Sequence, residues 1–331
     1  MVGFSELTED VARFIGRANC LAGIEALIYQ HHSDEPHLSI AVETASMVSG
    51  GKRCGRLDGA VHRLLRVAWQ TELASRLGSA FDEPGLLRVT SQTLPVNAYY
   101  ALFNGYRALA RVEGTATDRH SSIQDAFAKN RTPRLPVPWC ATLAGNPEEP
   151  ADCQFEPAGL VTPYSFNPME RSHPRGAYLW AALRMTRRWK YELARTEWLR
   201  KKENRKADGT MRKRLPKGEA ERIANGMRPT SLLDFIYEQR RRANYETADE
   251  YGAEVTDADI RRFHGGMEVL LDAGMLIIET QLARRSSVAQ LDELASAWMP
   301  GAKRIGPWAA ERVQRRLHVI RQAVGESAAA S

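Results

Sequence analysis

The chain has 331 residues, of which 43% are hydrophobic and 26% are charged, and its formal net charge is +6. This length suits one large domain or two small ones, and the composition is that of a soluble globular protein. The sequence has no apolar run close to the roughly 20 residues that cross a bilayer. It also lacks the basic flank and apolar block of a secretory signal. We therefore expect a cytoplasmic protein that does not contact a membrane.

The residues that commonly bind metals are dispersed. The four cysteines form no C-x-x-C pair, so we interpret them as reduced structural residues: Cys20, Cys54, Cys140 and Cys153. Three histidines lie near one another at His31, His32 and His37, but no carboxylate or thiol accompanies them at ligand spacing. The sequence therefore predicts neither a metal site nor a cofactor.

Helical periodicity dominates the first part of the chain. It predicts helices over residues 4–29 and 57–77, and we expect residues 86–94 to be extended up to Pro95. We assign residues 1–94 to an N-terminal helical region. A further helix over residues 97–111 carries two different faces, one apolar and one polar and cationic. The polar face contains Arg107 and Arg111, which we expect to contact a polyanion.

A shorter helix follows Gly114, with His120 near its start. Residues 95–128 form the first of two helical blocks. A dense series of prolines over residues 133–174 then forbids long helices, so this segment is predicted to be irregular or to contain β-strands. We interpret residues 129–226 as an insertion that is first rich in proline and then basic.

The basic part of this insertion concentrates positive charge. Residues 184–217 contain fourteen lysines and arginines against four acidic residues, a local surplus larger than that of the whole chain. This density favours a polyanionic partner, with RNA or DNA ahead of a membrane surface. A helix is predicted over residues 177–202, and its interleaved aromatic side chains suit either base stacking or a buried face. The candidate nucleic-acid contacts here are Arg187, Arg188, Lys190, Lys201 and Lys202.

The second helical block covers residues 227–285 and contains the strongest functional signal. Periodicity places an apolar stripe along residues 232–243, and Arg240 falls inside this stripe. Arg241 points away from the stripe and is a further candidate for nucleic-acid contact. A lone buried charge costs several kcal/mol, so Arg240 requires a carboxylate partner or a wet cleft. Two interpretations follow: a structural ion pair, or an arginine that binds phosphate.

The remainder of the chain is also predicted to be helical. Thr256 begins a long amphipathic helix with a capping sequence, and its apolar positions extend to Leu282. Residues 286–331 are predicted to form two further helical stretches, broken at Pro300-Gly301 and Gly306-Pro307, and a disordered tail over residues 326–331.

The two helical blocks together resemble one known family. In the first block, the run from Ala98 to Phe103, then Arg107, Gly114 and His120, resembles the opening helices of HEPN domains (higher eukaryotes and prokaryotes nucleotide-binding). In the second block, the run R-x-x-A-N-Y from Arg240 to Tyr245, with its loop and long helix, resembles the closing half. The family commonly has R-x-x-A-D-Y there. The resemblance covers about 90 residues, and the insertion between the blocks is unusually long.

The resemblance implies a mainly α fold: a HEPN-like helical bundle with an irregular Pro-rich insertion and additional N- and C-terminal helices. It also implies a homodimer in which motif arginines line one cleft. Many members are metal-independent endoribonucleases that act as toxins or antiviral effectors, with the signature Arg, four to six residues, then His. In that chemistry the RNA 2'-hydroxyl attacks the neighbouring phosphate, Arg neutralises charge and His moves a proton.

This chain departs from the signature because Tyr245 stands where His is expected. A phenol with a pKa near 10 is a poor general base. Our first hypothesis is an RNA-cleaving effector in which Arg240 clamps phosphate, Asn244 and Tyr245 orient the substrate, and His120 transfers a proton. Its partners would be RNA, a second copy and an antitoxin or sensor protein. The alternative is a non-catalytic HEPN-like module that binds nucleic acid or a nucleotide and acts with a partner protein. A third option is an unrelated helical scaffold with a solvated basic face.

Overall fold

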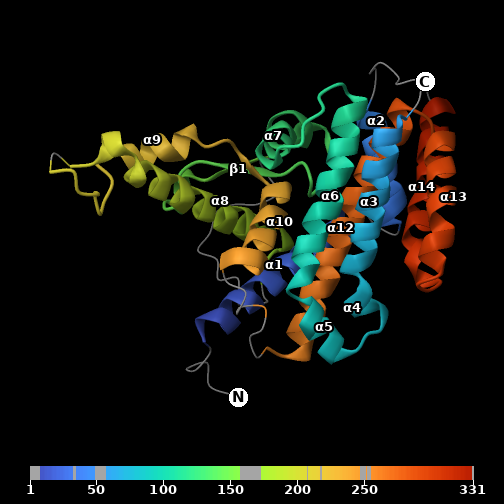
Figure 1. Ribbon diagram of the computed structural model, residues 1–331, viewed down its shortest axis with the longest axis horizontal. Coiled ribbons are helices and arrows are strands. Elements are labelled where there is room, and N and C mark those ends of the chain that lie inside the picture. The colour runs from blue at the N-terminus through green and yellow to red at the C-terminus, as the bar shows by residue number, and fades with distance from the viewer. Residues whose placement is uncertain are drawn as a thin grey trace.

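The computed structural model describes residues 8–32, 35–48, 57–156, 173–206, 208–216, 218–246, 251 and 255–329. The fold is mainly helical, which confirms the predicted class (Figure 1). The helices that precede the first block are α1 (Glu9–His31), α2 (Pro36–Met47), α3 (Gly59–Ser75), α4 (Leu77–Ala80) and α5 (Pro84–Thr90).

The middle of the chain combines long helices with short irregular elements. Its helical elements are α6 (Thr93–Val112), α7 (His120–Ala126), the π-helical turn η2 (Phe127–Arg131), the 3-10 turns η3 (Thr132–Arg134), η4 (Pro150–Asp152) and η5 (Lys202–Asn204), α8 (Arg175–Arg200) and α9 (Glu219–Gly226). The last part contains α10 (Leu232–Arg241), the π-helical turn η6 (Arg242–Glu246), α12 (Asp257–Arg285), α13 (Val288–Lys303) and α14 (Trp308–Ala329).

Helix α12 is the centre of the bundle. It packs against α1, α2, α6 and α14, and most of its side chains are buried, including charged ones. In Figure 1, α3, α6 and α12 run side by side, and α2, α13 and α14 cover the side remote from α8. Helix α6 also contacts α10, so the two helical blocks meet although the insertion separates them in sequence.

A small antiparallel sheet ties the insertion to the second block. Its strands are β1 (Thr142–Ala144), β2 (Gln154–Glu156) and β3 (Thr230–Ser231), in the order β2-β1-β3. Leu143 pairs with Phe155 on one side and with Thr230 on the other. Because β3 immediately precedes α10, the sheet fixes the start of the helix that carries Arg240. Residues 157–172 of the Pro-rich segment lie outside the described residues.

Local capping explains where the main helices begin. The Ser231 and Asp234 side chains form a reciprocal capping box at α10, and Thr256 accepts a hydrogen bond from the Asp259 amide at 3.2 Å at the start of α12. Such a cap contributes about 1 kcal/mol. The predicted start of the long helix at Thr256 is therefore confirmed.

The extended segment predicted before Pro95 is wrong, because this stretch is helical. Pro84 occupies the first turn of α5, and the Glu83 carboxylate accepts from the Leu86 amide at 2.5 Å. Pro95 lies in the first turn of α6, where a missing N–H removes no intrahelical hydrogen bond. Pro95 therefore lies at the start of a helix instead of ending an extended piece.

Two further predictions about helix ends are wrong. Pro300 lies inside α13, only one turn before the helix ends at Lys303, so it interrupts little of the hydrogen-bond ladder. The tail expected to be disordered from residue 326 instead continues α14 as far as Ala329, and residues 330–331 lie outside the described part. Within the basic part of the insertion, residues 219–226 form α9, whose first turn is acidic as helix starts favour.

Helix α8 has two different halves. Its N-terminal half packs against α1, and Leu179, Trp180 and Leu183 are buried in the common core. Its C-terminal half projects from the bundle with α9 and forms an arm at the left of Figure 1. Among the described residues, no helix combines the length and apolarity needed to span a membrane.

Candidate nucleic-acid site

Arg240 is surrounded by aromatic rings. Its side chain lies in the buried stripe of α10, as predicted, and the residue is only 9% exposed. The Nη2 atom donates a hydrogen bond to the Tyr100 hydroxyl at 2.7 Å. The guanidinium carbon lies 5.2, 5.9 and 5.3 Å from the ring centres of Tyr100, Tyr237 and Tyr245. Each such cation–π contact contributes about 0.5–2 kcal/mol.

Arg240 has no ion-pair partner among the residues that the structure describes, whereas nearby arginines do. Arg242 pairs with Glu238 at 2.6 Å, and Arg107 pairs with Asp118. The Nε atom of Arg240 is buried and makes no hydrogen bond within the described part of the chain. A nearly buried guanidinium with phenols as its neighbours retains donor capacity and positive charge for an anionic ligand.

His120 lies in the same cluster. Its ring stacks on Phe103 with centroids 4.1 Å apart, and its Nδ1 atom is 2.8 Å from the Tyr99 hydroxyl. Burial, followed by the charges of Arg240 and Arg107, lowers the pKa of His120 below its usual 6.5, so the ring is neutral at neutral pH. Hereafter the Arg240 cluster means Tyr99, Tyr100, Phe103, His120, Tyr237 and Arg240.

The two predicted orienting residues lie at the surface beside this cluster. Tyr245 is 67% exposed in η6, and its ring faces both Arg240 and Arg241. Asn244 is exposed in the same turn. Sequence spacing therefore located Arg240, Asn244 and Tyr245 together, and the fold adds His120 from the first block.

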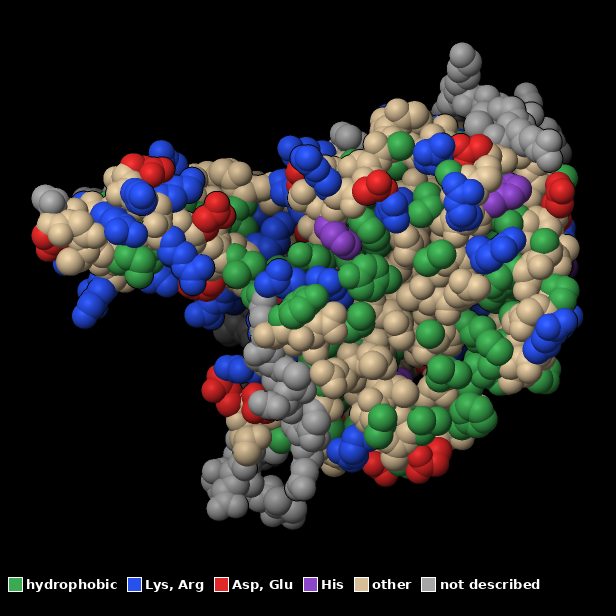
Figure 2. Space-filling model, in the orientation of Figure 1, with side chains coloured by type: hydrophobic (Ala, Val, Ile, Leu, Met, Phe, Trp, Pro, Cys, Tyr) green, Lys and Arg blue, Asp and Glu red, His purple; other side chains and the backbone are tan. Residues whose placement is uncertain are grey.

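Some of the cationic residues predicted to contact nucleic acid are exposed, whereas others are already engaged by carboxylates of the protein. Arg188, Lys201 and Lys202 are exposed on the arm, where Figure 2 shows many Lys and Arg side chains on one projecting surface. Arg111 is exposed and pairs with Asp58 at 2.8 Å. Lys190 is instead drawn inward, with its Nζ atom 3.4 Å from an oxygen of the buried Asp234.

Arg187 has a structural role, and its predicted contact with nucleic acid is wrong. The residue is 1% exposed, and it donates to the backbone carbonyls of Leu143, Gly145, Ala224 and Arg228. These bonds fasten α8 to the sheet and to α9. A buried guanidinium whose donors are satisfied by carbonyls is not available to a ligand.

A groove of about 700 Å³ lies on the side of α10 that carries Glu238, Gln239 and Arg242. It lies among α1, α8 and α10, and its polar lining residues include Arg13, Arg17, Arg188, Glu192, Glu238 and Arg242. Trp189 also lines it, and the Trp189 ring lies 6.1 Å from that of Tyr237. The groove therefore reaches the base of the arm, but its lining includes none of the residues of the Arg240 cluster.

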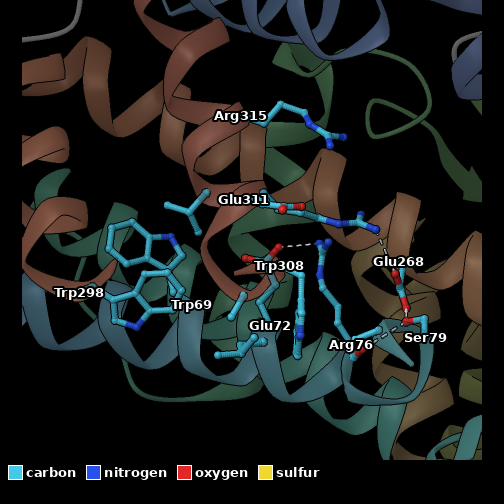
Figure 3. Close-up of a pocket in the computed structure, with 14 residues that line it drawn as sticks. Trp69, Glu72, Arg76, Ser79, Glu268, Trp298, Trp308, Glu311 and Arg315 are labelled. Carbon is cyan, nitrogen blue, oxygen red and sulfur yellow. Dashed lines mark hydrogen bonds and ion pairs between the residues drawn. The ribbon is translucent and has the colours of Figure 1, made fainter. Parts of the chain in front are cut away.

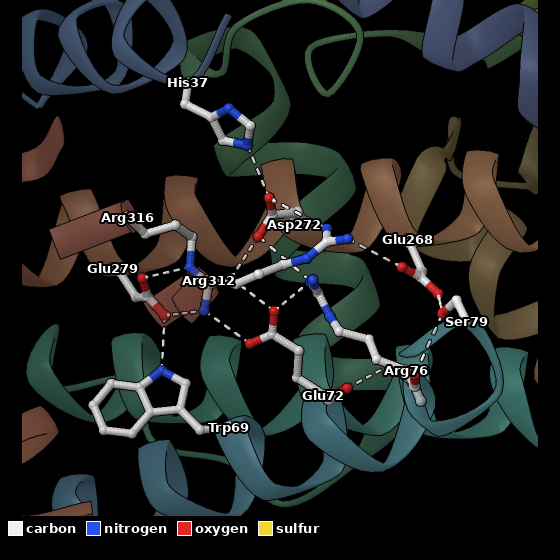
Figure 4. A network of polar contacts seen from close by, with 11 residues as sticks. His37, Trp69, Glu72, Arg76, Ser79, Glu268, Asp272, Glu279, Arg312 and Arg316 are labelled. Carbon is white, nitrogen blue, oxygen red and sulfur yellow. Dashed lines mark hydrogen bonds and ion pairs between the residues drawn. The ribbon is translucent and has the colours of Figure 1, made fainter. Parts of the chain in front are cut away.

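The structure also contains a buried ionic network that was not predicted from the sequence. Arg316 is fully buried and donates to Glu72, Asp272 and Glu279 at 2.6–2.9 Å. Figure 4 shows these side chains converging from α3, α12 and α14. His37 adds a contact of 2.8 Å to Asp272. On α12, Asp272 follows Glu268 by four residues and Glu279 follows Asp272 by seven. This spacing places the three carboxylates on one face of the helix and could have revealed the network.

The charges within this network compensate one another. Burial alone would raise the pKa of Asp272, but the hydrogen bond from His37 and the charges of Arg76 and Arg316 hold that pKa below its usual range. Because each buried carboxylate faces a guanidinium, we assign the network to joining the three helices. It does not bear on the choice of ligand.

A cavity of about 230 Å³ lies beside the network. In Figure 3, Trp69 and Trp298 stand on one side of it, and Arg76, Ser79 and Glu268 stand on the other. Glu268 accepts hydrogen bonds from Ser79 and Arg312, so its charge is already engaged. The Arg240 cluster is therefore the better candidate site, because its guanidinium faces no carboxylate among the described residues. No family model, curated protein or solved structure matches this chain.

Proposed function

We propose that this protein is a HEPN-type endoribonuclease that cleaves RNA without a metal ion at the Arg240 cluster. One observation supports this proposal most: a guanidinium that is 9% exposed, bonded to a phenol and close to the neutral His120. The planar arginine fork matches the oxygens of a phosphate and stays charged at any working pH. The surrounding tyrosine rings provide faces on which bases can stack.

The proposed reaction is a transesterification within the RNA chain. The 2'-oxygen forms a bond to phosphorus as the bond from phosphorus to the 5'-oxygen breaks. The 2'-hydroxyl loses its proton, and the leaving 5'-oxygen gains one. Arg240, from the second helical block, stabilises the negative charge that develops on the phosphate. His120, from the first block, contributes to the same stabilisation. The products are a 2',3'-cyclic phosphate and a 5'-hydroxyl end.

The arm and the groove provide a route for the RNA backbone. Arg188 belongs to both, and Lys201 and Lys202 extend the basic surface outward. Phosphate contacts of this kind position a nucleic acid without reading its sequence. From the resemblance we also propose that the protein forms a homodimer that brings two Arg240 clusters to one cleft, and that an antitoxin or sensor protein controls it.

The test is RNA cleavage in the presence of EDTA. We expect the wild-type protein to cut tRNA or mRNA into fragments with cyclic phosphate ends, and Arg240→Ala to abolish cutting. Arg321→Ala is the matched control, because this arginine is an exposed residue of α14 that pairs with Asp292 of α13, away from the cluster. RNA left intact by the wild-type protein, or cut equally by Arg240→Ala, would overturn the proposal.

The second candidate function is a non-catalytic module that binds RNA or a nucleotide and acts with a partner protein. The presence of Tyr245 at the position of the signature His favours it, because a phenol is a poor general base. This candidate predicts binding that weakens steeply with salt, depends on Arg240 and produces no cleaved ends.

A further inference from the structure

We propose that Arg228, Gln124 and Tyr99 form a hydrogen-bonded chain that keeps the proton of neutral His120 on Nε2. His120 then donates a hydrogen bond to a phosphate oxygen and does not act as the base. The inference rests on the proposed function for the identity of the ligand. The chain of bonds itself can be tested without RNA.

Arg228 is the fixed end of the chain. Its Nη1 and Nη2 atoms donate to the two oxygens of Asp234 at 2.7 and 2.6 Å, and its Nε atom lies 2.5 Å from Asp125. Asp234 also caps α10, so Arg228 is bound to the helix that carries Arg240. A guanidinium has five N–H donors and no acceptor. Any further neighbour of Arg228 must therefore present an acceptor to it.

That requirement sets the orientation of the buried Gln124 amide. The Oε1 atom of Gln124 lies 3.4 Å from Nη2 of Arg228, and its Nε2 atom lies 3.4 Å from the Tyr99 hydroxyl oxygen. The reversed amide would place an N–H donor against the guanidinium. Gln124 therefore donates to Tyr99, and the Tyr99 oxygen accepts.

The Tyr99 hydroxyl then determines the tautomer of His120. Because Gln124 donates to its oxygen, the hydroxyl proton is directed to its other neighbour, Nδ1 of His120, at 2.8 Å. Burial raises the pKa of Tyr99, so the phenol keeps its proton at neutral pH. A neutral imidazole with an accepting Nδ1 carries its proton on Nε2.

This tautomer defines what His120 contributes to the reaction. The charged groups that face it are Arg107 and Arg240, and its aromatic neighbours are Tyr99, Tyr100, Phe103 and Tyr237. With both ring nitrogens committed, His120 has no lone pair for the 2'-hydroxyl proton. That proton passes to solvent base, the leaving 5'-oxygen takes one from water, and the Nε2–H group stabilises the phosphate. The cleavage rate should therefore rise with pH through the neutral range.

Gln124→Glu reverses the donor–acceptor direction of the hydrogen bonds between residue 124, Tyr99 and His120, and it nearly conserves the shape of the side chain. A carboxylate accepts from both Arg228 and the Tyr99 hydroxyl, so the Tyr99 oxygen must accept from Nδ1–H of His120. The proton of His120 then moves from Nε2 to Nδ1. Gln154→Glu is the matched control, because it adds the same charge on the exposed face of β2.

The experiment is a long-range ¹H–¹⁵N correlation spectrum of the full-length protein at pH 8, with the His120 signals assigned by His120→Gln. We expect the Nε2–H tautomer in the wild type and in Gln154→Glu, and the Nδ1–H tautomer in Gln124→Glu. The proposal is overturned by an Nδ1–H tautomer in the wild type, or by a folded Gln124→Glu variant that keeps Nε2–H.

Tyr99→Phe provides a second variant if Gln124→Glu does not fold. Loss of the hydroxyl donor should produce a mixture of both tautomers and raise the pKa of His120 in a histidine titration. A single unchanged Nε2–H tautomer in Tyr99→Phe would overturn the proposal. Expected tautomers together with RNA that is neither bound nor cut would instead overturn only the proposed function.

Discussion

The Nη2 atom of Arg240 donates to the hydroxyl of Tyr100 at 2.7 Å, although the two residues lie 140 positions apart. This bond joins α6 to α10 and therefore connects the two helical blocks across the insertion. It also holds the guanidinium against the tyrosine ring, since the same pair makes a cation–π contact at 5.2 Å.

Removing the Tyr100 hydroxyl should destabilise the protein. Tyr100→Phe keeps the ring and leaves a nearly buried guanidinium without this acceptor, so we expect the free energy of unfolding to fall by about 1–3 kcal/mol. Tyr245→Phe removes an exposed hydroxyl beside the same arginine and should change it by less than about 0.5 kcal/mol. Urea unfolding measures both values. Equal effects of the two variants would show that the Tyr100 bond does not stabilise the cluster.

The exposed arm should contribute to RNA affinity through charge alone. Affinity falls as salt rises, and each phosphate contact on single-stranded RNA adds roughly 0.7 to the steepness of log affinity against log salt. Replacing Lys201 and Lys202 by Gln should therefore make this dependence shallower by at most about 1.4. The control replaces Lys303 and Arg304, two adjacent exposed cations at the end of α13. Fluorescence anisotropy over a salt series measures the slopes. Identical slopes for both double variants would exclude the arm from the RNA path.

Arg316 should be essential for stability because it faces three buried carboxylates. Arg316→Met leaves Glu72, Asp272 and Glu279 without this partner, so we expect a loss of about 3–5 kcal/mol in the free energy of unfolding. Arg321 lies on the same helix as Arg316, is exposed and pairs with Asp292 of α13. Arg321→Met should lower the free energy of unfolding by at most about 1 kcal/mol. A fully stable Arg316→Met variant would mean that apolar packing can replace the network.

His264 should make stability depend on pH. Burial lowers the pKa of His264 to about 4, while an unfolded histidine titrates near 6.5. Between these values the unfolded state binds more protons, so the free energy of unfolding should fall as pH decreases from 6.5 to 4. The full loss is about 3 kcal/mol, at 1.36 kcal/mol for each pKa unit.

Chemical unfolding at a series of pH values tests this dependence. His264→Gln should flatten the curve in that window, because the titrating group is gone. His318→Gln, which removes an exposed histidine, should leave the slope unchanged. If His264→Gln keeps the wild-type slope, other groups account for the dependence.

Two adjacent glycines of α12 should respond oppositely to alanine. A Cβ atom at Gly266 would lie 2.6 Å from the backbone of Leu21 in α1, whereas one at Gly265 would meet nothing closer than 3.9 Å. Gly265→Ala should stabilise the protein by up to about 1 kcal/mol through helix propensity. Gly266→Ala should destabilise it by about 1–3 kcal/mol, because the two backbones must move apart. Thermal unfolding of both variants measures the difference, and equal melting temperatures would contradict the close contact of α1 and α12.

The sequence by itself determined the helical class and most long helices. Periodicity predicts a buried face from local spacing alone, so it identified the long helices around residues 177–202 and 260–282 and placed Arg240 inside an apolar stripe. The sequence-based prediction failed where one residue type is compatible with two local structures. Pro95 can end an extended segment or begin a helix, and only the packed structure selects the second.

Tertiary structure alone decided the partners of each charged side chain. Local spacing shows that Arg240 is buried, but it does not specify that phenols and His120 surround it, since those residues arrive from another block of the chain. The same reason explains Arg187, whose acceptors are backbone carbonyls of distant segments. The electrostatic energy of a charge depends on its neighbours in space, and chain topology sets these neighbours over separations that periodicity does not encode.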